Sequence, residues 1–290
     1  ARTLRHRGPD GEGFRNGPGY GLAHRRLSIV DLDGGAQPMA DETGRYWVTY
    51  NGEIYNHVEL RRELEALGHR FRTRCDTEVL VAGYAQWGEG LPARLRGMFA
   101  FAIVDEHEHV LFAARDRIGK KPFYWTRLAN GEVVFASELK ALVEDSRVPR
   151  TIDPAALRRF FCLRYVPDPL TIFDGVYKLR PGHSLTIRDG EPRESCYWRL
   201  SHAEQSSASI DEYAEQIREL LDDAVRVRLM GEVPLGAFLS GGIDSYAVVD
   251  SMSRVSDARV VACAMGFEDS RTDERPYARA AAQACGAELH

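Results

Sequence analysis

The chain has 290 residues, of which 44% are hydrophobic and 28% charged, enough for one large or two ordinary domains with buried cores. A formal net charge of −5 and apolar runs well short of the roughly 18 residues of a membrane span argue against nucleic-acid binding and membrane insertion. The five cysteines form no C-x-x-C pair, so we expect reduced, mostly buried thiols rather than a disulfide framework or a zinc site.

Residues 20–136 alternate short β-like runs with the turn-forming pairs Asn-Gly, Asp-Gly and Gly-Gly. The clearest strand-like runs are 46–50, 98–104 and 110–114. Helices are predicted at 56–67, 76–87 and 137–143. The first of them places Leu60, Leu64 and Leu67 on one face behind an asparagine cap. Strand runs mixed with a few helices predict a layered α+β domain.

Asp153 and Pro154 predict a helix through residue 161, as its cap and its first helical residue. We assign residues 1–200 to the first domain and the polar, serine-rich stretch 201–209 to a flexible linker. Helices and apolar strands then alternate through residues 210–290, which predicts the start of a doubly wound parallel α/β domain. These segments are 210–229, 233–239, 245–254, 259–265 and 274–285.

A Ser-Gly-Gly-Ile-Asp-Ser turn at 240–245 connects an apolar strand to the next helix. Paired glycines let backbone N–H groups approach a phosphate, and the helix dipole favours its negative charge. Ser240 and Ser245 add hydroxyls, while Asp244 can hold a Mg²⁺ ion. The Lys-Ser/Thr ending of a Walker A loop is absent. A simple capped glycine turn is the alternative, and the strand-turn-helix context favours the phosphate site.

Asn51 and Gly52 follow an alternating strand, where an Asn-Gly pair is a leading hairpin signal. The same pair offers a side-chain N–H beside an unobstructed backbone N–H, which is what an oxyanion hole requires. From these residues alone, both interpretations stay open.

Three other features have a structural interpretation, and the first of them has a functional one as well. Arg26 lies beside an apolar strand and suits either a bidentate carboxylate clamp or a surface charge. Asp76 is placed to cap the helix at 76–87. Residues 115–122 join two strands and are expected to be structural.

Eight motifs, taken in order, resemble those of the glutamine-hydrolysing asparagine synthetases. They are RHRGPDGEG, HRRLSIVD, YNGEIYN, CDTE, RGMFAFAIVD, ARDRIGKKPFYW, ASELKAL and VPLGAFLSGGIDS. The resemblance covers essentially the whole chain. It implies a class II glutamine amidotransferase domain, a four-layer αββα sandwich of the Ntn-hydrolase type. An ATP pyrophosphatase-type synthetase domain, similar to the adenine nucleotide alpha hydrolases, would follow it.

The resemblance also implies an ATP-dependent carbon–nitrogen ligase. Glutamine would be hydrolysed to supply ammonia to an acyl-adenylate made from aspartate and ATP, giving asparagine, glutamate, AMP and pyrophosphate. The implied cofactors are ATP and Mg²⁺, and the implied partners are small-molecule substrates. A cytoplasmic location is expected, and a homodimer is left open.

By resemblance, Arg26 would clamp the α-carboxylate of glutamine, while Glu53 and Asp76 would hold its α-amino group. Asn51 and Gly52 would form the oxyanion hole. ATP would contact Leu239, Ser240, Gly241, Gly242, Ile243, Asp244, Ser245 and Met265, with Asp244 also binding Mg²⁺.

The family's nucleophile is the cysteine at the mature N-terminus, and no cysteine precedes Cys75 here. We therefore expect the chain to lack this residue and to be truncated at both ends. One alternative is a β-lactam-type synthetase with a non-functional glutaminase domain, against which the retained glutamine-site residues argue. Another is a non-catalytic protein, against which the intact 240–245 turn argues. The acceptor carboxylate, aspartate or another, is left open.

Overall fold

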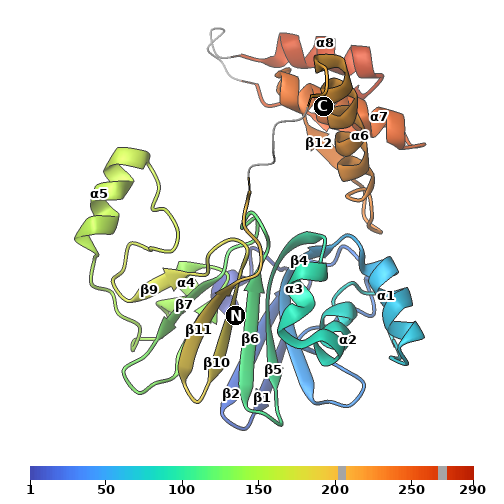
Figure 1. Ribbon diagram of the computed structural model, residues 1–290. Helices are drawn as coiled ribbons and strands as arrows, with labels where there is room; N and C mark the ends of the chain where they lie inside the picture. The colour runs from blue at the N-terminus through green and yellow to red at the C-terminus, as the bar shows by residue number, and fades with distance from the viewer. Residues whose placement is uncertain (202–206, 267–272) are drawn as a thin grey trace. The chain divides into compact units, whose positions relative to one another are not determined.

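The computed structural model describes residues 1–201, 207–266 and 273–290 (Figure 1). The chain forms two compact units, Ala1–Ser201 and His202–His290. The linker predicted at 201–209 falls largely on residues 202–206, which lie outside the described residues. In the described part of the chain, no helix is both long and apolar enough to span a bilayer.

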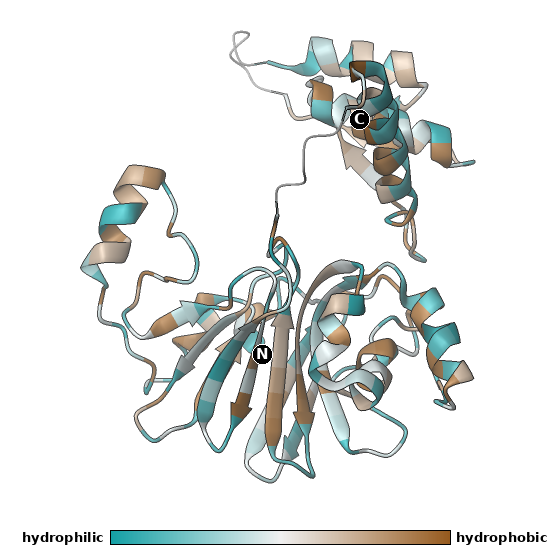
Figure 2. Cartoon of the chain, viewed as in Figure 1, coloured by the Kyte–Doolittle hydropathy of each residue, from teal (hydrophilic) through white to brown (hydrophobic). Residues whose placement is uncertain are grey.

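A six-stranded antiparallel sheet with the order β11-β10-β6-β5-β4-β3 forms the centre of the first unit (Figure 1). Its strands are β3 (Met39–Ala40), β4 (Tyr46–Ile54), β5 (Gly97–Asp105), β6 (Val110–Arg115), β10 (His183–Arg188) and β11 (Glu191–Cys196). Strand β5 is apolar on both sides: Phe99, Phe101 and Ile103 enter one core, and Ala100 and Ala102 enter another. This alternation follows the two-residue period of a strand and explains the apolar colouring of the central strands in Figure 2.

Helices cover the phenylalanine face of this sheet. They are α1 (His57–Ala66), α2 (Glu78–Trp87) and the short α3 (Leu91–Arg94), which follows the 3₁₀ turn η2 (Gly88–Gly90). Leu60 and Leu64 of α1 join the same core as Val79 and Leu80 of α2. The helices predicted at 56–67 and 76–87 are confirmed, although Leu67 is exposed rather than buried on the apolar face.

The alanine face of the central sheet packs on a second layer of strands. A three-stranded sheet, β8-β7-β9, consists of β7 (Tyr124–Arg127), β8 (Val133–Ala136) and β9 (Val176–Lys178). Phe123 and Phe135 from this layer meet Ala100 and Leu185 of the central sheet. The short helix α4 (Leu139–Leu142) packs on the other side of the small sheet through Leu142, so the layers run α, β, β, α and the predicted sandwich is confirmed.

Four further elements complete the described part of the first unit. The 3₁₀ turn η1 (Arg2–Leu4) precedes the hairpin of β1 (Gly11–Gly17) and β2 (Tyr20–Arg26). Helix α5 (Pro154–Leu163) begins as predicted, because the Asp153 carboxylate accepts the Ala155 N–H at 2.8 Å.

The second unit is a small parallel α/β structure. Its elements are α6 (Ile210–Arg226), β12 (Gly236–Phe238), α7 (Ile243–Val255), β13 (Val261–Cys263), α8 (Arg275–Cys285) and β14 (Glu288–Leu289). The strands pair in parallel in the order β12-β13-β14, with helices as the crossovers, so the predicted parallel sheet is confirmed. The strand predicted at 233–239 is shorter, at three residues.

All five cysteines are free thiols, as predicted. Only Cys75 is buried, however, while Cys162, Cys196 and Cys263 are exposed. The prediction of mostly buried thiols was therefore wrong, because these three lie at element ends and edges rather than in the cores.

Candidate functional site

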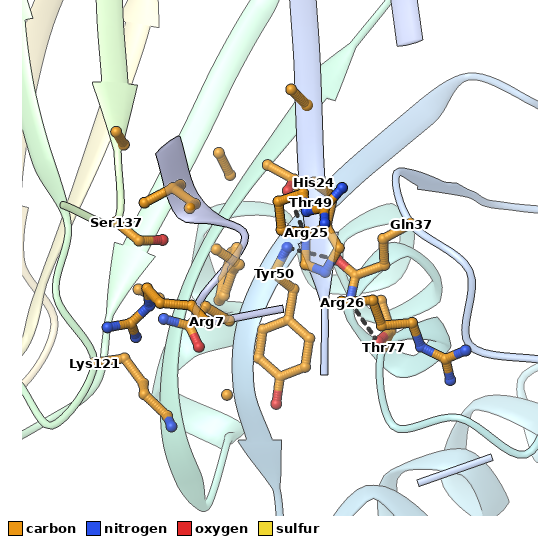
Figure 3. Close-up of a pocket in the computed structure, with 18 of the residues that line it drawn as sticks. Arg7, His24, Arg25, Arg26, Gln37, Thr49, Tyr50, Thr77, Lys121 and Ser137 are labelled. Atoms are coloured by element: carbon orange, nitrogen blue, oxygen red, sulfur yellow. Dashed lines mark hydrogen bonds between the residues drawn. The ribbon is translucent and has the colours of Figure 1, made fainter. Parts of the chain in front are cut away.

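The first unit contains a pocket of about 400 Å³, part of whose lining is drawn in Figure 3. The residues that the sequence predicts for glutamine all line this pocket. Arg26 comes from the end of β2, Asn51, Gly52 and Glu53 come from β4, and Asp76 comes from the segment before α2. These five predicted residues, up to 50 positions apart in the chain, thus share one cavity.

Asn51 and Gly52 lie inside the nine-residue strand β4, where they pair with Ala100 and Phe99 of β5. The hairpin interpretation was therefore wrong: the strand continues through the Asn-Gly pair because β5 supplies its backbone partners. A Cβ atom at Gly52 would lie 2.1 Å from the Met98 carbonyl oxygen, so only glycine allows this close approach.

The Asn51 amide is the unusual group of the pocket. Its Nδ2 atom is buried and has no hydrogen-bond partner among the described residues. A buried donor of this kind destabilises the fold by about 1–3 kcal/mol, so its retention points to a ligand acceptor. Asn51 can therefore offer its N–H groups to an oxygen atom in the pocket.

The Asp76 carboxylate is directed at β4 and does not cap α2, which begins at Glu78. Its Oδ2 atom accepts the Tyr50 hydroxyl at 2.9 Å and the Ile54 N–H at 2.8 Å. Burial, together with the neighbouring Asp76 charge, raises the pKa of the Tyr50 phenol well above its ordinary value, so the phenol stays a donor. The cap interpretation of Asp76 was therefore wrong. Asp76 is only 4% exposed and lies at the wall of the pocket.

Backbone carbonyls hold the Arg26 guanidinium in place. Nη1 donates to the Leu32 oxygen at 2.8 Å, and Nη2 donates to the Asp31 oxygen at 2.5 Å. Behind it, a Cβ atom at Gly8 would lie 2.3 Å from the Arg25 carbonyl carbon, and the Asp10 N–H donates to the Arg26 oxygen at 3.0 Å. The Gly-Pro-Asp turn therefore fixes the strand end that carries this cation.

His24 lines the same pocket in its neutral form. Burial, helped by the positive charge of Arg26, lowers its pKa from 6.5 to about 4. One ring nitrogen lies 3.2 Å from the Thr49 hydroxyl oxygen. At neutral pH the imidazole therefore adds no charge next to Arg26.

Cys75 and Lys121 are two of the pocket residues that were not predicted from the sequence. Cys75 lines the pocket beside Asp76, with its thiol 3.2 Å from the Thr77 hydroxyl, and burial raises its pKa to about 11. Lys121 lines the pocket from residues 115–122, which join β6 to β7 as predicted. Only the adjacency of Cys75 to Asp76 gave any signal in the sequence.

In the second unit, the 240–245 turn connects β12 to α7. The Ser240 and Ser245 hydroxyl oxygens lie 3.0 Å apart, and the Gly242 N–H donates to Ser240 Oγ at 3.3 Å. Gly241 has a φ of +82°, and a Cβ atom there would lie 2.5 Å from the Cβ of Tyr277 on α8. The turn needs glycine both for its conformation and for its contact with α8.

Helix α7 begins at Ile243, two residues earlier than predicted, which places Asp244 in its first turn. Leu239 is 1% exposed and bonded through its N–H to the Cys263 oxygen at 2.9 Å, so its side chain belongs to the core. Met265 is 70% exposed. Asp244 and Ser245 also line a pocket of about 430 Å³.

A Mg²⁺ ion at this turn would take few protein ligands. The part of the chain that the structure describes contains no group of three His, Cys, Asp or Glu residues arranged to hold a metal. Asp244 and the serine hydroxyls fit an ion held mainly by phosphate and water oxygens, which is the ordinary preference of Mg²⁺.

Two family models match this chain, and the boundary between them lies close to the boundary between the two compact units. Residues 1–198 match the family model of the glutamine amidotransferase domain, and residues 216–290 match that of asparagine synthase.

Individual relatives agree with these matches. Asparagine synthetase [glutamine-hydrolyzing] 1 of Bacillus subtilis is 40% identical over 98% of this chain and 44% of its own length. A putative asparagine synthetase 2 of Methanocaldococcus jannaschii is 36% identical over 95% of this chain and 57% of its own. Amidase chry2 of Gibberella zeae is 35% identical over 99% of this chain and 45% of its own. The chain thus spans about half the length of the relatives it matches.

Proposed function

Because this chain belongs to the glutamine amidotransferase domain family, we propose that its two units carry the two half-sites of a glutamine-dependent amide synthetase of the asparagine synthetase type. Glutamine hydrolysis in the first half-reaction supplies ammonia. In the second, ATP converts the side-chain carboxylate of aspartate to an acyl-adenylate, which ammonia attacks. The products are asparagine, glutamate, AMP and pyrophosphate.

The arrangement of the first pocket is the observation that supports this proposal most strongly. Arg26 provides a fixed cation for an α-carboxylate, and Glu53 and Asp76 provide carboxylates for an α-ammonium group. Asn51 Nδ2 and the Gly52 N–H are the donors for the γ-oxygen. Attack on the γ-amide carbon moves negative charge onto that oxygen, and fixed donors in a buried site stabilise it.

Cys75 is a poor candidate for the nucleophile, although it lines the pocket. The thiolate is the reactive form of cysteine, and a pKa of about 11 leaves Cys75 as a thiol at neutral pH. Its sulfur also lies 3.5 Å from an Asp76 oxygen, which disfavours a second negative charge. We expect the 290-residue chain by itself to release no glutamate from glutamine. Release above background that disappears in Cys75→Ser would contradict this.

The second half-site is assigned to the 240–245 turn. The N-terminus of α7, the Ser240 and Ser245 hydroxyls and the glycine N–H groups suit the pyrophosphate of ATP. Mg²⁺, when bound beside Asp244, would neutralise charge on that pyrophosphate. Adenylation is needed because a carboxylate is a weak electrophile and hydroxide a poor leaving group.

The experiment that tests the proposal measures pyrophosphate release by the full-length enzyme with glutamine, ATP and Mg²⁺. We expect release to depend on added aspartate and to be matched by asparagine and glutamate formation. Pyrophosphate release that ignores aspartate would reject aspartate as the acceptor.

A second candidate is an amide synthetase that acts on another carboxylate, which the similarity to a protein named amidase favours. In the same assay, such an enzyme would release pyrophosphate with a carboxylic acid other than aspartate, which a panel of carboxylic acids would identify. The β-lactam-type alternative needs no working glutamine site, and the assembled pocket argues against it.

A further inference from the structure

Lys121 brings a second cationic side chain into the pocket of the first unit. Within the described residues, its ammonium group has neither a hydrogen bond nor an ion pair, and the side chain is half-buried. A partly desolvated cation without a partner is unfavourable by itself and attracts an anionic ligand.

The backbone of Lys121 is fixed on both sides. Its N–H donates to Asp116 Oδ2 at 3.0 Å, and its carbonyl oxygen accepts from Arg115 Nε at 2.7 Å. The same Asp116 oxygen accepts the Phe99 N–H at 3.1 Å, and Phe99 is the cross-strand partner of Gly52. Lys121 is thus tied to the strand pair that carries the proposed oxyanion donors.

Lys121 and Arg26 lie on different sides of the pocket. Figure 3 shows Lys121 beside Arg7 on one side of Tyr50, with Arg26 and Thr77 on the other. The Arg26 guanidinium is held on its own side by the carbonyls of Asp31 and Leu32. An amino acid with its α-carboxylate at Arg26 would therefore point its γ-group toward the side of Lys121.

Charged groups of both signs lie near the Lys121 ammonium group. Burial lowers the pKa of its ammonium group, and the negative charge of Glu53 opposes this change. Asp116 adds a second negative charge near this group, while Arg7 and Lys120 add positive charge. Arg7 is paired with Glu138 at 3.1 Å, whereas the Lys121 ammonium group has no partner among the described residues and stays available to an anionic ligand.

We propose that Lys121 makes the pocket prefer a negatively charged γ-group. It binds the γ-carboxylate of glutamate, and stabilises the oxyanion formed from glutamine, more strongly than the neutral γ-amide. This inference rests on the proposed glutamine site and adds to it a residue that discriminates by charge.

The test is the binding of L-glutamate and L-glutamine to the 290-residue chain, measured by titration calorimetry at one ionic strength. Lys121→Met should weaken glutamate binding by about tenfold or more and glutamine binding by less than about threefold, since only glutamate loses a charge pair. Lys121→Arg should preserve the preference. Lys120→Met is the matched control: the Lys120 side chain is exposed and outside the pocket, so its charge is screened by solvent and its removal should weaken glutamate binding far less than Lys121→Met does.

Equal weakening of both ligands by Lys121→Met, or no effect on either, would overturn the proposal. Lys121→Gln, with thermal unfolding of each variant, guards against a folding defect. The role of Lys121 can fail while the glutamine site stands. This is the case if the wild-type chain binds glutamine, if Arg26→Ala abolishes that binding, and if Lys121→Met does not change the preference for glutamate. A wild-type chain that binds neither ligand would overturn both this proposal and the glutamine site.

Discussion

Asn51 is a single residue whose side chain lowers the stability of the fold and suits the binding of a ligand. Its amide is buried in the middle of β4 without a partner among the described residues, and its backbone pairs with Ala100 as in any strand. A valine or threonine would suit this strand position without the unsatisfied donor. The asparagine therefore makes sense only if its N–H groups meet an acceptor that the ligand provides.

We expect Asn51→Ala to lower glutamine turnover in the full-length enzyme by about 10²-fold or more, the usual effect of removing one oxyanion donor. Ammonium-dependent synthesis should be unchanged and the melting temperature should not fall, because Nδ2 has no partner to lose in the described structure. Asn56→Ala is the matched control: its amide accepts the Arg96 N–H at 2.8 Å and donates to the Arg94 oxygen at 3.0 Å, so it should lower stability instead. Proportionate loss of folding and of every activity in Asn51→Ala would make Asn51 a structural residue.

His24 should make the stability of the first unit depend on pH. Its pKa is about 4 in the folded chain and 6.5 as a free group, so between these values only the unfolded chain takes up the proton. The free energy of unfolding should therefore be highest above pH 6.5 and fall by roughly 3 kcal/mol as the pH drops to 4. His24→Asn should flatten this part of the profile in urea unfolding, whereas exposed His107→Asn should not. A slope that is identical in both variants would contradict the assignment.

At the scale of elements, the segment between β6 and β7 is organised by one buried carboxylate. Asp116 is 1% exposed and accepts four backbone N–H groups, two on each oxygen. Ile118 and Lys120 donate to Oδ1, while Phe99 and Lys121 donate to Oδ2. The segment is thereby joined to β5, and its Lys121 lines the pocket.

Asp116→Asn should destabilise the first unit by about 2–4 kcal/mol, because an amide NH₂ replaces one oxygen and leaves two buried N–H groups unpaired. Urea unfolding, with the midpoint and slope both fitted, measures the change. Asp33→Asn changes an exposed carboxylate in the same way and should have an effect within about 0.5 kcal/mol. Equal stability of the two variants would show that Asp116 does not organise the segment.

Elements with local signals were predictable from the sequence, and those set by distant contacts were not. Helix α5 begins where Asp153 and Pro154 predict, since a cap acts over three residues. From the sequence, the Asn-Gly pair in β4 had two possible interpretations, because only the nine-residue pairing with β5 excludes a turn. Lys121 could not be assigned to the pocket, since its place depends on Asp116 bonds to another strand. The gathering of Arg26, Asn51 and Asp76 followed from the resemblance rather than from periodicity.

At the scale of the whole molecule, each proposed half-site is built within its own compact unit. The glutamine pocket uses only residues of Ala1–Ser201, and the phosphate turn uses only residues of the second unit. The two half-reactions should therefore be separable by mutation.

Arg26→Ala should abolish synthesis from glutamine in the full-length enzyme and leave synthesis from added ammonium salt nearly intact. Among the described residues, the guanidinium donates to the carbonyls of residues 30–32 in its own unit, and ammonia bypasses the glutamine site. Asp244→Ala should stop synthesis from either nitrogen source, since it removes the carboxylate beside the departing pyrophosphate, while glutamine hydrolysis continues. Product formed with glutamine or ammonium, measured alongside glutamate release for each folded variant, gives the comparison. If Arg26→Ala lost ammonium-dependent synthesis as severely as glutamine-dependent synthesis, Arg26 would not belong to a separate glutamine site.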